Sequence, residues 1–416
     1  MSDENFPIND PTLQSYSFPD LLVPVVPQTE ESVDILIAGV SARGLAESAV
    51  RSRPAHRIVA ADYFGDFDLG LLCPHRSIKR DLSLPYDVRH LIAVSSGLLF
   101  DALIYVANLE NYPSVIETMA GGKPILGNSP AVLASARDPS RFFEFLTQAG
   151  IPMPKIALDP ASLDLDSSIS WLRKPVRSGG GHGIAVHRHE DRLEPGFFLQ
   201  EYLDGLSCGA VFAANGSDAC LLGISEQLIG RNEFGTDGFR YCGSILGPIE
   251  VGQAEWVNLV ESMRQVVRAI TREFHLVGVN GVDFILKGQT VYPLEINPRY
   301  TASMELVEWA HGLNIFKTHL DACQGRLPDF DLLAYPHAGY FGKAIRFASQ
   351  TLIFRDPRWW FDRGARDLPL DGEQITQGQP ICTLFSRGQS RSECYNRLAD
   401  DAATIEQACL KATTTV

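Results

Sequence analysis

Asp283 and Glu295 stand twelve positions apart, within short runs of β-type residues at 281–285 and 290–296. The link between the runs contains Gly288, and a glycine in a short link between alternating apolar runs predicts a β-hairpin. Folding the chain back at this glycine sets the two acids almost opposite each other. Their side chains should then leave the same face of the ribbon, because strand side chains alternate between faces.

The hairpin gathers further polar groups on that face. Asn297 follows Glu295 by two positions, so its carboxamide should join the two carboxylates. An oxygen-only set of this kind suits Mg²⁺ or Mn²⁺, which take few carboxylates together with phosphate oxygens and water. Arg299 adds a rigid positive fork suited to a carboxylate or a phosphate. The alternative, an exposed hairpin with solvated acids, does not explain why an apolar strand runs straight into Glu-Ile-Asn-Pro-Arg, and we favour the metal site.

A glycine-rich loop at 177–184 follows another predicted strand, at 171–176, and contains four glycines. Because glycine has no Cβ, the backbone N–H groups of such a loop can lie against phosphates. The loop is not the Walker motif, since no Gly-Lys-Ser/Thr ends it, and a hairpin turn would explain the glycines equally well. His182 within it is interpreted as a solvent-exposed turn residue rather than as a phosphate contact.

Asp283 followed by Glu295-Ile-Asn297-Pro-Arg299 resembles the metal-binding end of the ATP-grasp superfamily. The match is closer to the branch of predicted ATP-dependent carboligases related to biotin carboxylase. The likeness extends, with gaps, from about residue 32 to the C-terminus and is most specific between 171 and 305. It implies that Asp283, Glu295 and Asn297 hold Mg²⁺ or Mn²⁺ on the phosphates of ATP.

The resemblance also implies roles for residues outside the hairpin. Lys174 would contact the α- or β-phosphate beneath the glycine loop, and the segment after the predicted strand at 197–203 would form the hinge over the adenine. Arg299 and Glu305 would act on the reacting groups, although Glu305 could equally be an exposed helix acid and Arg299 could simply pair with it. The expected ATP-binding residues are Lys174, Ser178, Gly179, Gly180, Gly181, Gly183, Gln200, Glu201, Tyr202 and Leu203.

One position departs from the family pattern. A lysine that contacts ATP normally opens the helix predicted at 141–149, and the aligned residue here is Pro139, with Arg137 and Arg141 nearby. The sequence leaves open which residue makes that contact.

The N-terminal part reads as strand, glycine-containing turn, helix and strand, with strands at 33–38 and 57–61 and further strands at 103–106 and 123–126. The turn lacks the middle glycine of G-x-G-x-x-G, so a dinucleotide cofactor is rejected. What remains is a doubly wound domain whose turn could face an anionic substrate. After the third strand, the Glu110-Asn111 turn is interpreted either as a ligand contact at the carboxyl end of the sheet or as a helix cap.

The expected fold is α/β (α+β): an ATP-grasp fold with an N-terminal doubly wound domain and a small C-terminal β-rich cap. The predicted organisation is an arm at 1–31, a Rossmann-like domain at 32–130, an ATP-grasp domain at 131–330 (131–199 with the lid, 200–330 with metal site and hinge), and a cap with a closing helix at 331–416.

Composition restricts the partners. The chain has 416 residues, 45% of them hydrophobic, and a net charge of −14, with no basic cluster, so we expect no nucleic-acid partner. Eight scattered cysteines without a CxxC pair and no signal peptide indicate a cytoplasmic protein. No apolar run reaches the roughly 18 residues of a membrane span. A homodimer is left open as the expected assembly.

These features together predict a Mg-ATP-dependent carboxylate–amine ligase that forms ADP through an acyl phosphate. The branch it resembles suggests addition of an amino acid in cofactor biosynthesis, with small-molecule acid and amine substrates that the sequence does not name. Two alternatives stay open: a carboxylase of the biotin carboxylase type that uses bicarbonate, and a non-catalytic ATP-binding regulator.

Overall fold

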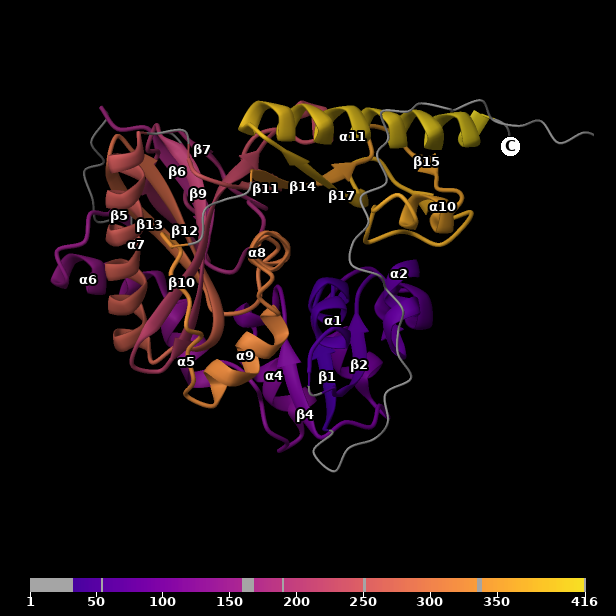
Figure 1. The fold of residues 1–416 in the computed structure, drawn as a ribbon, viewed down its shortest axis with the longest axis horizontal. Coiled ribbons are helices and arrows are strands. Elements are labelled where there is room, and N and C mark those ends of the chain that lie inside the picture. The colour runs from indigo at the N-terminus through magenta and orange to yellow at the C-terminus, as the bar shows by residue number, and fades with distance from the viewer. Residues whose placement is uncertain are drawn as a thin grey trace, which may run out of the picture.

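The computed structural model describes residues 33–53, 55–158, 168–188, 191–249, 252–334 and 339–414. The arm expected at 1–31 lies outside the described residues. Within them the chain forms a parallel sheet, a small antiparallel sheet, a large antiparallel sheet and a two-stranded ribbon (Figure 1). No helix in these ranges is both long and apolar enough to cross a membrane. All eight cysteines are free thiols.

The first domain is built on a parallel sheet with the strand order β3-β2-β1-β4. The strands predicted at 33–38, 57–61 and 103–106 are present to within a residue at each end. The strand predicted at 123–126 is wrong: only a parallel bridge between Leu103 and Ile125 forms there. Pro124 has no N–H to continue a ladder. The strands are β1 (Asp34–Ala38), β2 (Arg57–Asp62), β3 (His75–Ser77) and β4 (Ala102–Tyr105).

Helices cover both faces of this sheet, as the doubly wound prediction requires. Residues of β1 alternate between two cores: Ile35 and Ile37 pack with α1 (Arg43–Val50), and Leu36 and Ala38 pack on the other side. The helices on that second side are α3 (His90–Ser95) and α4 (Pro113–Ala120). The short α2 (Phe67–Leu72) lies between β2 and β3 in the chain.

A small antiparallel sheet with the order β5-β8-β6-β7 carries the glycine loop between β6 and β7. It follows α5 (Pro130–Ala136) and α6 (Pro139–Gln148). The predicted strands at 171–176 and 197–203 appear as β6 and β8. The strands are β5 (Ile156–Ala157), β6 (Trp171–Pro175), β7 (Ala185–His187) and β8 (Phe197–Glu201).

The large sheet has seven strands in the order β13-β12-β9-β10-β11-β14-β17. The predicted hairpin is present as β12 and β13, with Gly288 in the turn at a φ of +61°. Its last two strands belong to the C-terminal part and continue the sheet, a connection that the sequence did not predict. The strands are β9 (Leu206–Asn215), β10 (Ala219–Ile229), β11 (Tyr241–Leu246), β12 (Val277–Lys287), β13 (Thr290–Asn297), β14 (Tyr340–Phe347) and β17 (Pro380–Gly388).

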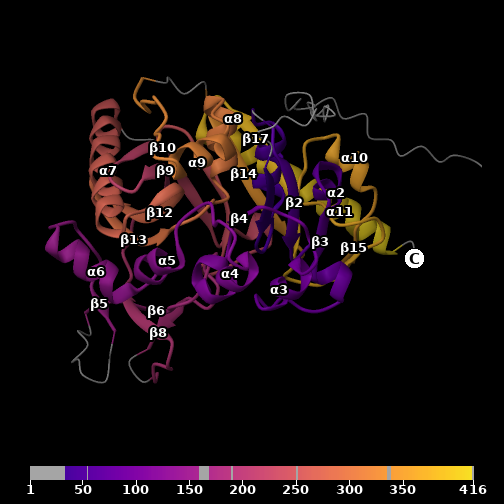
Figure 2. The same ribbon diagram turned by 90° about the horizontal axis from the view of Figure 1, so that it is seen from below.

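Helices complete the layers around the large sheet. The long α7 (Gln253–Phe274) packs in one core with α6 and the strands β9, β10, β12 and β13. On the opposite face, α8 (Met304–His311) and α9 (Ile315–Cys323) share a core with α1 of the first domain. The closing helix α11 (Arg391–Thr414) packs on β14 and β17 with the ribbon of β15 (Leu352–Ile353) and β16 (Gln374–Ile375) and with α10 (Pro357–Phe361). In both views α7 lies at the end of the molecule opposite the C-terminus (Figures 1 and 2).

Candidate active site

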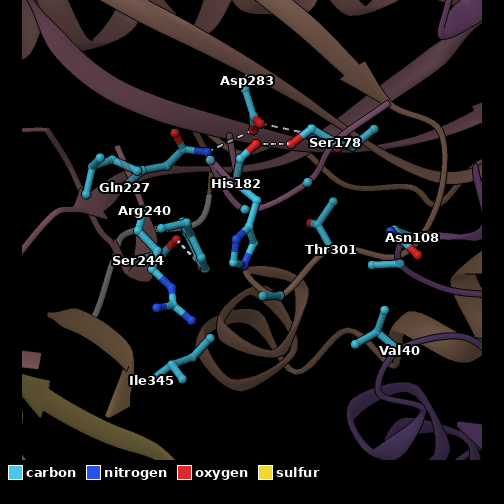
Figure 3. A pocket seen from close by; sticks show the side chains of 18 of the residues that line it. Val40, Asn108, Ser178, His182, Gln227, Arg240, Ser244, Asp283, Thr301 and Ile345 are labelled. Atoms are coloured by element: carbon cyan, nitrogen blue, oxygen red, sulfur yellow. Dashed lines mark hydrogen bonds between the residues drawn. The ribbon is translucent and has the colours of Figure 1, made fainter. Parts of the chain in front are cut away.

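One cavity of about 920 Å³ is enclosed by the first domain, the small sheet, the large sheet and the C-terminal segment (Figure 3). All the residues of the predicted catalytic, ATP-binding and metal-binding sets line it. These are Lys174, Ser178, Gly179, Gly180, Gly181, Gly183, Gln200, Glu201, Tyr202, Leu203, Asp283, Glu295, Asn297, Arg299 and Glu305.

The acidic pair lies on adjacent strands at one end of this cavity. Asp283 and Glu295 are direct cross-strand partners, and a bulge follows Asp283. Asp283 accepts hydrogen bonds from Nε2 of Gln227 at 2.8 Å and from Nδ2 of Asn297 at 3.0 Å (Figure 3). Burial and the neighbouring charge of Glu295 raise the pKa of Asp283 to about 7.

Two neighbouring cations, Arg137 and Lys174, lower the pKa of Glu295. Burial raises the pKa of Glu295, but Arg137 and Lys174 oppose it and hold that pKa below its usual value. Arg137 Nη1 lies 3.4 Å from Glu295 Oε2. Near neutral pH Glu295 is therefore ionised and Asp283 is only partly ionised, so the two acids of the pair carry different charge.

This donor set fits Mg²⁺ only when another group completes the coordination. Among the described residues, no group of three or more His, Cys, Asp and Glu side chains comes together as a metal site. The amide oxygen of Asn297 already accepts from Arg299 at 3.0 Å. Mg²⁺ usually takes one or two carboxylates together with phosphate oxygens and water, so Asp283 and Glu295 suffice if a nucleotide supplies the remainder.

Lys174 is held close to the acidic pair. Its side chain is buried, and Nζ donates to Oε1 of Gln200 at 3.2 Å. Burial lowers the pKa of Lys174, while Glu295 and Asp283 partly offset that effect. An ammonium has three protons, and the bond to Gln200 uses one of them. The remaining protons can serve an anion in the cavity.

The glycine loop rests on the start of β11. Tyr241 donates its backbone N–H to the carbonyl of Gly180 at 3.1 Å, and Ser178 Oγ donates to the carbonyl of His182 at 2.6 Å. Gly181 has a φ of +77°, and a Cβ there would stand 1.9 Å from the carbonyl oxygen of Phe239. Glycine is required at this position by both conformation and space.

His182 is exposed at the loop, as predicted, yet it also lines the cavity beside Arg240 (Figure 3). Burial and the charge of Arg240 lower the pKa of His182. It therefore presents a neutral imidazole near neutral pH, which does not favour a charge-assisted bond to phosphate.

The expected hinge follows the end of β8. Glu201 is tied to the start of the small sheet: its Oε2 accepts from the backbone N–H of Lys155 at 2.9 Å. Tyr202 donates its own N–H to the carbonyl of Ser170 at 2.7 Å. These contacts fix the end of β8, and the hinge over an adenine stays a prediction.

Arg299 is fixed by a residue of the first domain. Its Nε donates to Oε1 of Glu110 at 2.9 Å, and both side chains are buried. Nη2 donates to Asn297 and Nη1 to the carbonyl of Tyr300, at 3.0 and 3.1 Å. The suggested pairing of Arg299 with Glu305 is therefore wrong, because the acid that pairs with Arg299 is Glu110. Two of its five N–H donors remain for a ligand.

Glu305 is anchored by two cations. Its side chain is 13% exposed and contacts Arg43 of α1 and Lys343 of β14. The alternative of an exposed helix acid is wrong, because the start of α8 faces the cavity between two domains. A role in catalysis stays a prediction.

The sequence alone did not assign roles to several residues of the site. Arg137, two positions before Pro139, donates to the carbonyls of Ile296 at 2.8 Å and Ser178 at 3.2 Å, and to Asn111 Oδ1 at 3.0 Å. Pro139 instead opens α6 as its first residue. The Glu110-Asn111 turn thus orients two arginines of the site. Only the proximity of Arg137 to Pro139 gave a signal for this in the sequence.

The sequence of residues 136–303 matches the ATP-grasp domain. An uncharacterized protein of Methanocaldococcus jannaschii is 21% identical over 89% of this chain and 92% of its own length. The carbamoyl phosphate synthase large chain of Mycobacterium sp. strain JLS is 28% identical to this chain over an aligned stretch. That stretch covers 47% of this chain and only 18% of the synthase chain.

Two solved structures have a similar fold. The L-amino acid ligase of Bacillus licheniformis has a TM-score of 0.65 at 15% identity, covering 90% of this chain and 98% of that one. The biotin carboxylase domain of Hydrogenobacter thermophilus 2-oxoglutarate carboxylase, in complex with MgADP and bicarbonate, has a TM-score of 0.65 at 14% identity, covering 88% of each chain.

The chain therefore contains an ATP-grasp domain and has the ATP-grasp fold, with an N-terminal parallel-sheet domain. ATP-grasp enzymes are ATP-dependent ligases and carboxylases that work with Mg-ATP.

Proposed function

We propose that this protein is a Mg-ATP-dependent carboxylate–amine ligase that forms ADP through an acyl phosphate. The observation that carries the proposal is the cross-strand pair of Asp283 and Glu295, set in one cavity with Lys174 and Arg299. Acids for a metal and cations for phosphate and carboxylate thus meet beneath a glycine loop. The likeness to the L-amino acid ligase supports the choice among ATP-grasp activities.

In this proposal, Asp283 and Glu295 would hold Mg²⁺, which would withdraw charge from the γ-phosphate. Lys174 and Arg137, which both act on the charge of Glu295, would supply positive charge, and the backbone of 178–183 would surround the phosphates. Most of the catalysis would come from positioning and electrostatics, as in phosphoryl transfer generally. A loop closing over the cavity would keep water away from the acyl phosphate.

Arg299 would orient the substrate carboxylate. Its guanidinium is planar and pre-set by Glu110, so the two remaining donors can bind both oxygens of a carboxylate. The acid attacks the γ-phosphorus of ATP and ADP leaves. The neutral amine then attacks the acyl carbon and phosphate leaves, which forms the C–N bond. Glu305, paired with Lys343, lines the same cavity and would act on the reacting groups.

The experiment is a measurement of ADP release with pools of carboxylic acids and amines. The ligase predicts ADP release that needs both an acid and an amine, and a product mass equal to acid plus amine minus water. ADP release with no dependence on the amine would contradict it. The Glu295→Gln protein is the control for contaminating ATPase activity.

A carboxylase is the second candidate, favoured by the likeness to the domain solved with bicarbonate. Incorporation of labelled bicarbonate into an acid-stable product would identify it. ATP binding without ADP release under any condition would instead indicate the regulator. Domain boundaries, a homodimer and a cytoplasmic location stay predictions.

A further inference from the structure

The cavity extends across the large sheet, from the hairpin at one edge to β14 and β17 at the other. Arg240, which directly precedes β11, lines it, and the proposed chemistry assigns no role to this residue. Apolar side chains of β14, β16 and β17 line the same end of the cavity: Ile345, Phe347, Ile375, Pro380 and Ile381.

The guanidinium of Arg240 is held in place at this end. Its Cζ lies 4.0 Å from the centre of the Phe347 ring, and a Cβ on Gly378 would stand 4.0 Å from its Nη1. The side chain is half-buried and lies in the cavity beside His182 (Figure 3). Because arginine keeps its proton in proteins, Arg240 is a positive charge in the cavity.

The charge of Arg240 has no acid partner in the part of the chain that the structure describes. Its guanidinium makes neither an ion pair nor a hydrogen bond there. Burial lowers the pKa of Arg240, and the exposed Asp237 only partly offsets that effect. Other cations of the cavity do have partners: Lys343 pairs with Glu305, and Lys79 and Arg80 pair with Glu373. A half-buried cation without a partner favours an anionic ligand.

The part of Arg240 that can meet a ligand is the end of its fork. Nε is buried and has no hydrogen-bond partner among the described residues, so it does not reach the cavity. The two Nη groups remain. Two parallel N–H donors match the two oxygens of a carboxylate.

The phosphates of ATP are expected at the other edge of the sheet. The strands β9 and β10 separate β11 from β12, so the backbones of β11 and β12 lie about 14 Å apart at about 4.8 Å per strand. Phosphates on a metal at Asp283 and Glu295 would stay beside β12. Both acids act on the pKa of Lys174, and neither is among the charges that act on the pKa of Arg240. Arg240 therefore suits an anion other than the metal-bound phosphates.

We propose that Arg240 binds a carboxylate that does not react, so that one of the two substrates carries a second carboxylate. This inference rests on the proposed ligase function, in which Arg299 orients the reacting carboxylate. The second carboxylate belongs either to a dicarboxylic acid or to an amino acid that serves as the amine. Ile345 and Ile375 would contact the carbon chain of that substrate.

The test measures binding by calorimetry without ATP, so that it does not depend on turnover. Succinate, glutarate and adipate are compared with butyrate, valerate and hexanoate, which have the same chain lengths and one carboxylate instead of two. 4-Aminobutyrate is compared with n-butylamine in the same way, which tests the amine as the source. In the wild-type protein the extra carboxylate should tighten binding by at least about tenfold in one of these pairs.

Three variants show whether Arg240 causes that preference. Arg240→Met should remove it, and Arg240→Lys, which keeps the charge without the fork, should keep part of it. Arg57→Met is the matched control, because Arg57 is 64% exposed and lies outside the cavity, and it should keep the whole preference. Since Arg240 has no ion pair to lose, Arg240→Met should melt close to the wild-type temperature.

Three results would overturn the proposal: no preference in any pair, a preference unchanged in Arg240→Met, or Mg-ATP binding that is at least about tenfold weaker in Arg240→Met. The last result would assign the anion at Arg240 to the nucleotide. If the preference is present and depends on Arg240 but no acid–amine pair releases ADP, the ligase function fails and the carboxylate site remains.

Discussion

Two groups of acids differ in what balances their charge. At the hairpin, Asp283 accepts hydrogen bonds from the side-chain amides of Gln227 and Asn297, and Arg137 lies 3.4 Å from Glu295. Around α1, the buried Arg43 contacts Glu47, Asp68, Glu305 and Asp367 within the protein itself. In the proposed function the hairpin acids take a metal cation from outside, whereas Arg43 already joins acids from three parts of the chain.

The largest expected effect is the loss of unfolding free energy when Arg43 is replaced. Arg43→Met keeps the length of the side chain but leaves several buried carboxylates without their cation, which costs about 3–5 kcal/mol. Denaturant unfolding measures the loss. Arg57→Met is the matched control, because Arg57 is 64% exposed in its pair with Asp34 and should cost less than about 1 kcal/mol. A small loss at Arg43 would show that the cluster does not hold the domains together.

A substitution at the hairpin should instead lower the turnover rate. Glu295→Gln should cut turnover by at least about a hundredfold, the usual size for an electrostatic contact to the transition state, while the fold stays intact. ADP release and melting temperature are measured on one preparation. Glu273→Gln, at an exposed position on α7, is the control. A fully active Glu295→Gln protein would exclude the acid from the chemistry.

Arg299→Lys tests orientation of the acid rather than nucleotide binding. A lysine lacks the planar guanidinium that Glu110 orients and cannot bind a carboxylate through two parallel N–H donors. We therefore expect kcat to fall by about tenfold or more while ATP affinity changes only a few-fold. If Arg299 only anchors the first domain, the variant will instead lose melting temperature and keep its activity per molecule.

Lys174→Ala should act on nucleotide binding and not on the orientation of the acid. Loss of a charged hydrogen bond of about 1.5–3 kcal/mol corresponds to roughly ten- to a hundredfold weaker ATP binding. Lys123→Ala and Lys155→Ala are controls, since neither residue lines the cavity. Equal ATP affinity in all three variants, measured by calorimetry, would refute the assignment.

The sequence predicted the features that depend on neighbouring residues. Turn geometry at Gly288 sets the register of β12 and β13, so the pairing of Asp283 with Glu295 followed from spacing alone. The glycine loop and the helix α6 were predicted for the same reason: each is a continuous local pattern.

Features that join distant parts of the chain were not predicted. Arg43 and Glu305 are 262 positions apart, and Glu110 and Arg299 are 189 apart. The pairing of β11 with β14 likewise depends on the tertiary fold. No local sequence periodicity indicates such contacts, because the partners meet only when the domains pack together.

The most direct test of the hairpin as a cation site is an ATP titration with and without Mg²⁺, by calorimetry, on the wild-type and Asp283→Asn proteins. In the wild-type protein, Mg²⁺ should tighten ATP binding by at least about tenfold, because the acids otherwise repel the phosphates. In Asp283→Asn, metal-free ATP should bind no more weakly than to the wild type, and Mg²⁺ should add little. The same Mg²⁺ effect in both proteins would contradict the assignment of Asp283 to the metal.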